Sequence, residues 1–314
     1  MCGDFPRSGP LMGMAAMLGR WVRQLWPFQP RPASGPRHPV APCHVLGLAG
    51  LAALALLAMP FLLAAPAAAE PEKCPRMVAG PVLKPRVIPA AFRLAAAEGG
   101  QVRFTFVGHA TFLIESPHGV TIATDYNDYV RPNIVPQIVT MNRAHDTHYT
   151  NNPDPGIAHI LRGWNDDGTP PRIELTVDDV WIRNVSTNIR QGSATRYDGN
   201  SIFVFEVAGL CIAHLGHLHH ILTPDHLEAL GRIDVVLAPV DGSYTLDIEG
   251  MMENLKAINA PLVIPMHYFS SWGLDRFLSR LGKEYQIQRS ESPSVLLARE
   301  TLPRKPTVLV LPGR

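Results

Sequence analysis

Cysteine is scarce in this chain, and its few cysteines lie far apart. The 314 residues include 4 cysteines (Cys2, Cys43, Cys74 and Cys211), and no two of them form a Cys-x-x-Cys pair. Thiolate zinc sites and thioredoxin-type redox sites both need closely spaced cysteines, so the sequence argues against both. A disulfide between Cys74 and Cys211 stays open, because the sequence does not decide it.

Net charge is also nearly absent. The sum of 28 Lys and Arg against 27 Asp and Glu leaves a net charge of +1. Proteins that bind nucleic acid usually carry a clear basic excess, so we expect no nucleic-acid partner. With 46% hydrophobic and 18% charged residues, the chain can form one large domain or two small ones.

One long apolar run without any charge occupies residues 45–69. A leader over 1–44 precedes it, rich in Pro, Gly and Arg and not expected to fold alone. A basic leader, an apolar core and an Ala-rich end are typical of a secretory signal, which predicts a periplasmic or secreted protein. The alternative is an uncleaved tether in the inner membrane with the rest facing outward, because the run could just span a bilayer.

The residues after this run predict a linker, one globular domain and a tail. Residues 70–100 are rich in Pro and Ala, the domain covers 101–300, and 301–314 form the tail. We expect helices at 157–164, 224–230, 248–258 and 274–281. Alternating or apolar runs predict strands at 102–107, 111–116, 120–125, 173–177, 180–185, 201–207, 210–214, 233–240, 261–267, 285–289 and 294–298. Hairpins come first and β and α alternate later, which predicts an α/β (α+β) fold of two mixed sheets with helices outside.

Several histidines follow apolar runs. His145 and His148 flank Asp146 after the run 134–139, His267 ends the run 261–267, and four more histidines lie within 214–220. Imidazole and carboxylate groups at strand ends suit a divalent metal. The alternative for each histidine is a polar side chain satisfied by the neighbouring backbone.

Six motifs, taken in their order and spacing over residues 101–298, resemble one known family. They are FVGHATFLIE (106–115), IATD (122–125), VTMNRAHDTH (139–148), IAHLGHL (212–218), APVDG (238–242) and VIPMHY (263–268). Together they resemble the metallo-β-lactamase superfamily, in the branch that includes ascorbate-6-phosphate lactonase and the N-acylphosphatidylethanolamine phospholipases D. The resemblance implies an αββα sandwich with a metal site at one edge.

The metal-binding loop departs from the family pattern H-x-H-x-D-H. His145 and His148 match its second and last histidines, whereas Arg143 stands at the first histidine and Thr147 at the aspartate. Asp146 is displaced by one position and is a candidate ligand or catalytic group.

Later ligands are also altered. Asn188 lies where the next histidine is expected, His217 replaces the bridging aspartate, and His267 is kept. Removing the shared carboxylate takes away negative charge between two cations, so one metal per chain is the better expectation. The resemblance therefore implies a single zinc, with manganese or iron as alternatives, on His145, His148, His217 and His267.

This site implies hydrolysis by metal-activated water. The branch suggests an ester, a lactone or a phosphodiester, from a small-molecule or lipid-derived substrate. Arg143 or His109 would steady the developing oxyanion, Asp125 would support the metal-binding loop, and Asp241 would cap a helix. The alternative is a catalytically inactive member of the fold that binds a metal or a ligand without turnover.

Overall fold

The computed structural model describes residues 100–313. The predicted leader, the apolar run and nearly all of the predicted linker lie outside the described residues. No helix within 100–313 is long and apolar enough to cross a membrane.

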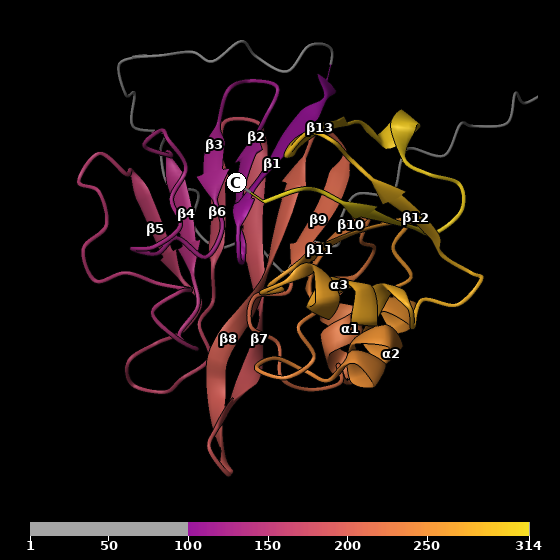
Figure 1. Ribbon diagram of the computed structural model, residues 1–314. Coiled ribbons are helices and arrows are strands. Elements are labelled where there is room, and N and C mark those ends of the chain that lie inside the picture. Colours follow the sequence, from indigo (N-terminus) through magenta and orange to yellow (C-terminus); the bar gives the residue numbers. More distant parts are fainter. Residues whose placement is uncertain (1–99, 314) are drawn as a thin grey trace, which may run out of the picture. The chain divides into compact units, whose positions relative to one another are not determined.

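Two mixed β-sheets pack face to face (Figure 1). The first contains β1 (Val102–Gly108), β2 (Thr111–Glu115), β3 (Thr121–Ala123), β4 (Ile138–Met141), β5 (His159–Arg162) and β13 (Ser294–Leu297), in the order β13-β1-β2-β3-β4-β5. The second contains β6 (Glu174–Val177), β7 (Val180–Gln191), β8 (Ala194–Val207), β9 (Leu210–His214), β10 (Val235–Pro239), β11 (Leu262–Met266), β12 (Gln286–Arg289) and β14 (Thr307–Val310), in the order β12-β14-β11-β10-β9-β8-β7-β6. The predicted pair of mixed sheets is confirmed.

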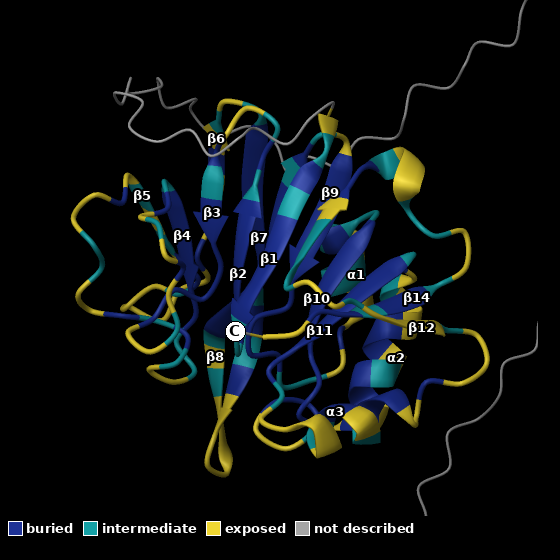
Figure 2. Ribbon diagram, turned by 45° about the horizontal axis from the view of Figure 1, so that its top comes forward, coloured by how far each residue is buried: buried dark blue, intermediate teal, exposed yellow. Residues whose placement is uncertain are grey.

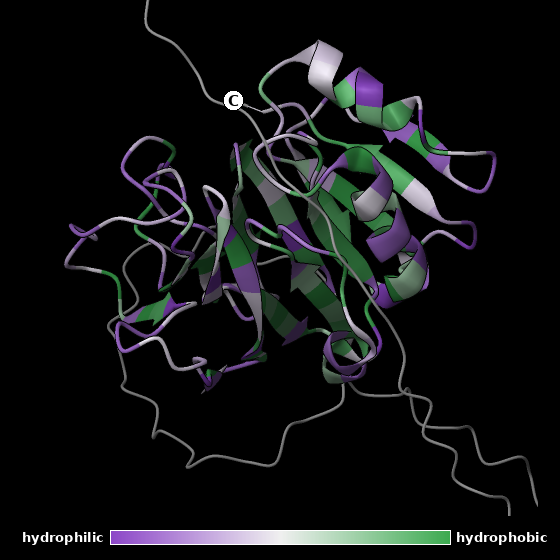
Figure 3. Cartoon of the chain, turned by 90° about the horizontal axis from the view of Figure 1, so that it is seen from below, coloured by the Kyte–Doolittle hydropathy of each residue, from purple (hydrophilic) through white to green (hydrophobic). Residues whose placement is uncertain are grey.

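Two apolar layers hold the sandwich together. Between the sheets, Phe104 and Phe112 pack with Phe203 and Phe205, and all four side chains are fully buried. The strands around them are buried along most of their length and apolar (Figures 2 and 3). Burial of such large apolar surfaces is the main favourable contribution to folding.

The second layer lies under the helices. The helices α1 (Pro224–Leu230), α2 (Ile248–Ile258) and α3 (Ser271–Leu278) pack on the outer face of the eight-stranded sheet (Figure 1), and η2 (Arg299–Thr301) is a short 3₁₀ turn. Met251 and Phe277 are fully buried there, against strand residues such as Val236 and Val263.

Strand direction explains where the functional residues gather. In the second sheet β9, β10, β11 and β14 run parallel, and in the first sheet β3, β4 and β5 run parallel. Carboxyl ends of parallel strands meet at one edge of a sheet, which is where open α/β sheets place their ligand sites. The loops after β1, β3, β4, β9, β10 and β11 carry the candidate residues.

Most predicted elements after residue 200 are confirmed. Helix α2 covers the predicted 248–258, and α1 begins with Thr223 as N-cap and Pro224 in its first turn. Ala208 and Gly209 form the two-residue connection from β8 to β9, with φ angles of 51° and 73°. Such left-handed turns match the twist of a hairpin.

Two predictions were wrong. Residues 157–164 contain no helix, because His159–Arg162 pairs in parallel with β4 as the edge strand β5, whose residues alternate between half-buried and exposed. The segment after residue 300 is not a free tail, because β14 lies between β11 and β12 in the second sheet. Two prolines, Pro303 and Pro306, precede β14. Because proline is unfavourable within strands, the short apolar run after them was not predicted as a strand.

One cysteine of the described residues bears on redox state. Cys211 lies fully buried in β9 and is disulfide-bonded. The chain's other cysteines, Cys2, Cys43 and Cys74, lie outside the described residues.

Candidate metal centre

Four imidazoles from three loops meet at the edge of the sandwich. His145 and His148 lie in the loop after β4, His217 follows β9, and His267 follows β11. One nitrogen from each ring lies within 4.8 Å of the others. His145 Nε2 is 2.6 Å from His217 Nε2, and His267 Nε2 is 3.2 Å from His148 Nε2. The structure therefore brings together all four of the predicted ligands.

These nitrogens fit a divalent cation. Burial first, and then the neighbouring imidazoles, lower the pKa of His148 well below its usual value, and the same causes lower the pKa of His217. Neutral imidazoles then face one another through their Nε2 atoms, and two lone pairs at such short separation repel. A cation between them relieves that repulsion, and neutral imidazole nitrogen is an ordinary zinc ligand.

Asp125 fixes the orientation of His148. It follows β3 in a left-handed conformation (φ 42°), and its Oδ2 lies 2.6 Å from His148 Nδ1, with both side chains fully buried. Asn142 Nδ2 donates to the other carboxylate oxygen at 3.0 Å. Burial raises the pKa of Asp125 to about 6, although His214 and Asn142 act to lower it. With its proton on Nδ1, His148 directs the Nε2 lone pair towards the other three histidines.

Asp241 occupies the equivalent place behind His267. Its Oδ1 lies 3.1 Å from His267 Nδ1, and its Oδ2 accepts hydrogen bonds from the backbone N–H groups of Ser243 and Tyr244. Burial would raise the pKa of Asp241, but these contacts outweigh it and lower the pKa. The prediction that Asp241 caps a helix was wrong, because Asp247 caps α2.

A rigid loop presents His217. The backbone N–H of His217 donates to Asn200 Oδ1 at 2.8 Å, and Asn200 Nδ2 donates to the carbonyl of Leu215 at 3.2 Å. Gly216 has a φ of +60°, and a Cβ there would lie 2.5 Å from Asn142 Nδ2 and overlap Asn200. The sequence interpretation missed Asn142 and Asn200, although polar residues beside the apolar stretches of β4 and β8 were a signal.

His214 and His219 brace the loops around the centre. His214, fully buried, donates from Nε2 to the carbonyl of Ala110 at 2.9 Å and accepts at Nδ1 from the Gly216 N–H. His219 donates from Nε2 to the carbonyl of Tyr244 at 2.7 Å. These bonds agree with the alternative given for each histidine from the sequence, a polar side chain that is satisfied by the backbone.

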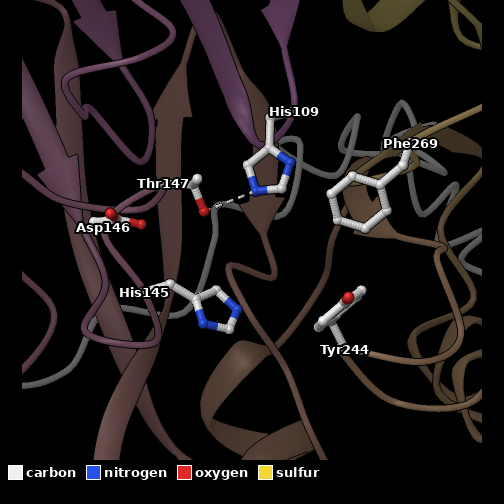
Figure 4. Close-up of a pocket in the computed structure, with 6 residues that line it drawn as sticks. All are labelled: His109, His145, Asp146, Thr147, Tyr244 and Phe269. Carbon is white, nitrogen blue, oxygen red and sulfur yellow. Dashed lines mark hydrogen bonds between the residues drawn. The ribbon is translucent and has the colours of Figure 1, made fainter.

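A cavity of about 570 Å³ opens beside His145, one of the four histidines (Figure 4). Its walls are His109, His145, Asp146, Thr147, Tyr244 and Phe269. His109 Nε2 lies 3.1 Å from Thr147 Oγ1, and burial followed by His267 and His145 lowers the pKa of His109 to about 3. His109 is therefore neutral at physiological pH. The sequence interpretation missed Tyr244 and Phe269, because aromatic residues in loops are more often packing residues.

Two candidate catalytic residues point elsewhere. Arg143 does not line the cavity: its Nη1 is 3.1 Å from Asp166 Oδ1, and its guanidinium lies 5.9 Å from the ring centroid of Trp164. Asp146 lines the cavity but is not one of the four converging groups, and its Oδ2 accepts from Tyr129 Oη at 2.8 Å. In this geometry both side chains bind partners other than the candidate ligands.

The comparisons with known proteins agree with this geometry. Residues 103–267 match the family model described as the beta-lactamase superfamily domain, which is more than half of the chain. The chain belongs to the metallo-β-lactamase superfamily. A solved structure of a proposed zinc-dependent hydrolase of this superfamily from Thermotoga maritima is similar, with 31% identity and a TM-score of 0.51. The match covers 68% of this chain and 100% of that one, and the predicted fold is confirmed.

Curated relatives are metal-dependent hydrolases by name. A UPF0173 metal-dependent hydrolase of Methanoculleus marisnigri is 26% identical over 188 residues, which cover 53% of this chain and 81% of the relative. One from Thermoplasma acidophilum is 39% identical over 74 residues, which cover 23% of this chain. That stretch spans only 33% of the Thermoplasma protein.

Proposed function

We propose that the protein is a metal-dependent hydrolase with one divalent ion held by His145, His148, His217 and His267. The observation that carries the proposal is the convergence of these four imidazoles, whose ligand atoms lie within 4.8 Å of one another. An all-nitrogen donor set favours zinc, with manganese or iron as alternatives. A bound ion of this kind supplies a water whose pKa falls to about 7 and which can attack an ester, lactone or phosphodiester.

The chain's own residues supply orientation and polarity. Asp125 and Asp241 lie at the Nδ1 sides of His148 and His267, so that the opposite nitrogens face each other and would be free to bind the ion. His109 and Thr147 line the cavity as a neutral hydrogen-bonded pair. We propose that this pair donates to the oxygen that gains negative charge during the reaction, a role that the sequence offered to either Arg143 or His109.

Three positions where the family pattern has metal ligands carry other residues here, which supports one ion rather than two. Arg143 is paired with Asp166, Thr147 is paired with His109, and the backbone N–H of Asn188 donates to His220 Nε2 at 3.2 Å. None of these three side chains is of a type that ordinarily binds zinc, which takes Cys, His, Asp or Glu. A four-histidine shell that closes completely on its ion is the alternative, and it would make the protein a binder without turnover.

Removal and return of metal tests the proposal. The full-length protein is stripped with a chelator, reloaded with zinc and assayed on 4-nitrophenyl acetate, a homoserine lactone and bis(4-nitrophenyl) phosphate. We expect activity on at least one substrate to disappear and return. It should be lost in His148→Ala and persist in His159→Ala, a half-buried histidine on the edge strand β5. Zinc uptake without any turnover would favour the binder.

We also propose that the protein is exported, to the periplasm or beyond, with an inner-membrane tether through residues 45–69 as the alternative. The disulfide at Cys211 supports this, because disulfides persist mainly in oxidising compartments. N-terminal sequencing of the protein from fractionated bacterial cells tests it. A new N-terminus near residue 70 in the periplasm is expected, and an intact N-terminus in the cytoplasm would contradict export.

A further inference from the structure

The cavity beside the metal centre restricts the chemistry of the substrate. Resting on the hydrolase function proposed above, we infer that the substrate is an uncharged carboxylic ester or lactone whose acyl or aryl group packs against Tyr244 and Phe269. The inference follows from three features of the cavity: an aromatic wall, the lack of a cationic side chain in its lining, and a network that fixes the wall in place.

Tyr244 and Phe269 form one wall of the cavity. Their ring centroids lie 5.5 Å apart with planes inclined by 70°, and Figure 4 shows both rings on the side opposite Asp146. Both rings are largely exposed, Tyr244 by 59% and Phe269 by 63%. Phe269 also lies 5.6 Å from the His109 ring, between centroids. An apolar group placed there would remove aromatic surface from water within reach of the metal centre.

No Lys or Arg lines the cavity among the described residues. Three arginines close to the lining are held by protein acceptors. Arg143 pairs with Asp166, Arg276 donates to the carbonyl of Asp241 at 3.0 Å, and Arg190 donates to the carbonyls of residues 243–245. The charged side chain in the lining is the carboxylate of Asp146. A phosphodiester stays anionic throughout its reaction and is normally held by arginine, lysine or a second metal. This cavity therefore favours a neutral substrate.

The aromatic wall is held in place before any substrate binds. Arg190 Nη2 donates to three successive carbonyls, those of Ser243, Tyr244 and Thr245, at 3.0, 3.3 and 3.2 Å. His219 adds a bond to the same Tyr244 carbonyl. The backbone of Tyr244 is thus tied to the β7–β8 hairpin, and a fixed wall costs little entropy on binding.

The reaction is a simple hydrolysis. The oxygen of one water bonds to the carbonyl carbon, the acyl C–O bond breaks, and the alkoxy oxygen leaves with one proton as the alcohol. An ester also yields the separate carboxylate, whereas a lactone yields one hydroxycarboxylate that carries both groups. In both cases the second proton passes to solvent. No oxidant, reductant or further reactant is needed.

Two measurements on the full-length, zinc-loaded protein test the inference. The first compares kcat/KM for 4-nitrophenyl acetate and 4-nitrophenyl octanoate, with bis(4-nitrophenyl) phosphate alongside. The second is calorimetric binding of hexanamide, acetamide and dimethyl phosphate, which needs no turnover. Each added methylene can contribute up to about fourfold, so we expect a preference of at least about tenfold for the longer acyl group in both measurements.

Substitutions in the aromatic wall test whether the preference for the longer acyl group depends on Tyr244 and Phe269. Tyr244→Ala and Phe269→Ala should each reduce it by about fivefold, while Tyr197→Ala, an exposed aromatic residue at the other cavity on the β7–β8 hairpin, should leave it unchanged. Equal binding of the two amides, or tighter binding of dimethyl phosphate, would overturn the inference. If the zinc-loaded protein hydrolyses none of the substrates but still binds hexanamide more tightly than acetamide, the hydrolase function alone would be overturned.

Discussion

Asp125 Oδ2 and His148 Nδ1 lie 2.6 Å apart with both side chains fully shielded from solvent. A carboxylate behind a ligand imidazole sets the tautomer of the ring and raises its basicity. The pair joins the loop after β3 to the loop after β4, so that the first sheet determines where the Nε2 lone pair of His148 points.

The variant Asp125→Asn separates metal binding from folding. We expect its zinc affinity to fall by about 10- to 100-fold, because the amide lacks the charge that strengthens the imidazole. The metal-free variant should unfold no more easily than the natural chain, since burial raises the pKa of Asp125 and the ionised carboxylate is costly there. Competition with a fluorescent chelator and urea unfolding measure the two quantities. Unchanged zinc affinity, or the same loss in the Asp225→Asn control, an exposed residue in the first turn of α1, would contradict this role.

Gly216 offers a test of the loop that carries His217. In Gly216→Ala the new Cβ would overlap Asn200 and crowd Asn142 in addition to adopting a positive φ. Gly192→Ala has nearly the same φ, +61°, with nothing within 4 Å of the new Cβ, so it measures the backbone cost alone. We expect about 1 kcal/mol of destabilisation at Gly192 and about 1–3 kcal/mol more at Gly216. Equal destabilisation by the two substitutions in urea unfolding would show that the loop shifts to accommodate the Cβ at residue 216.

The histidine centre should make the metal-free protein sensitive to acid. Burial, followed by the neighbouring imidazoles, lowers the pKa of His217. Below about pH 6.5 the unfolded chain takes up a proton at this residue that the folded chain does not, so stability falls as pH falls. The loss for one such histidine is up to about 1.4 kcal/mol per pH unit. Urea unfolding between pH 7.5 and 5.5 measures the free energy of unfolding of the two metal-free proteins. This free energy should fall less steeply with decreasing pH in His217→Gln than in the natural chain. Equal slopes in the two proteins would refute the effect.

Arg190 should govern the order of the Tyr244 loop. In Arg190→Ala three carbonyls lose their shared donor, so the amides of residues 243–245 should exchange with deuterium about tenfold faster. Arg196→Ala on the same hairpin is the control. Unchanged exchange in Arg190→Ala would mean that His219 and Asp241 hold the loop without it.

Sequence patterns were most informative where local chemistry decides structure. Thr223 and Pro224 start α1, and Ala208 and Gly209 turn the hairpin, both through interactions within a few residues. These elements are therefore readable from the sequence. The bounds of the helix over 248–258 agree for the same reason.

Long-range pairing decided what the patterns missed. Residues 159–162 become a strand only because β4 offers an edge, and β14 forms only because β11 and β12 lie on either side of it. Arg143 occupies a ligand position in the family pattern, yet its side chain is held by Asp166, 23 residues further along the chain. Contacts of this kind have no local signal in one sequence.

Metal stoichiometry of the full-length protein is the most direct test of the single-ion centre. Elemental analysis should give one zinc per chain, and X-ray absorption should show a shell of nitrogen ligands at about 2.0–2.1 Å. The metal should be lost in His148→Ala and retained in His159→Ala, a half-buried histidine on the edge strand β5. Two ions per chain, a shell dominated by oxygen, or retention of metal in His148→Ala would contradict a centre built on His145, His148, His217 and His267.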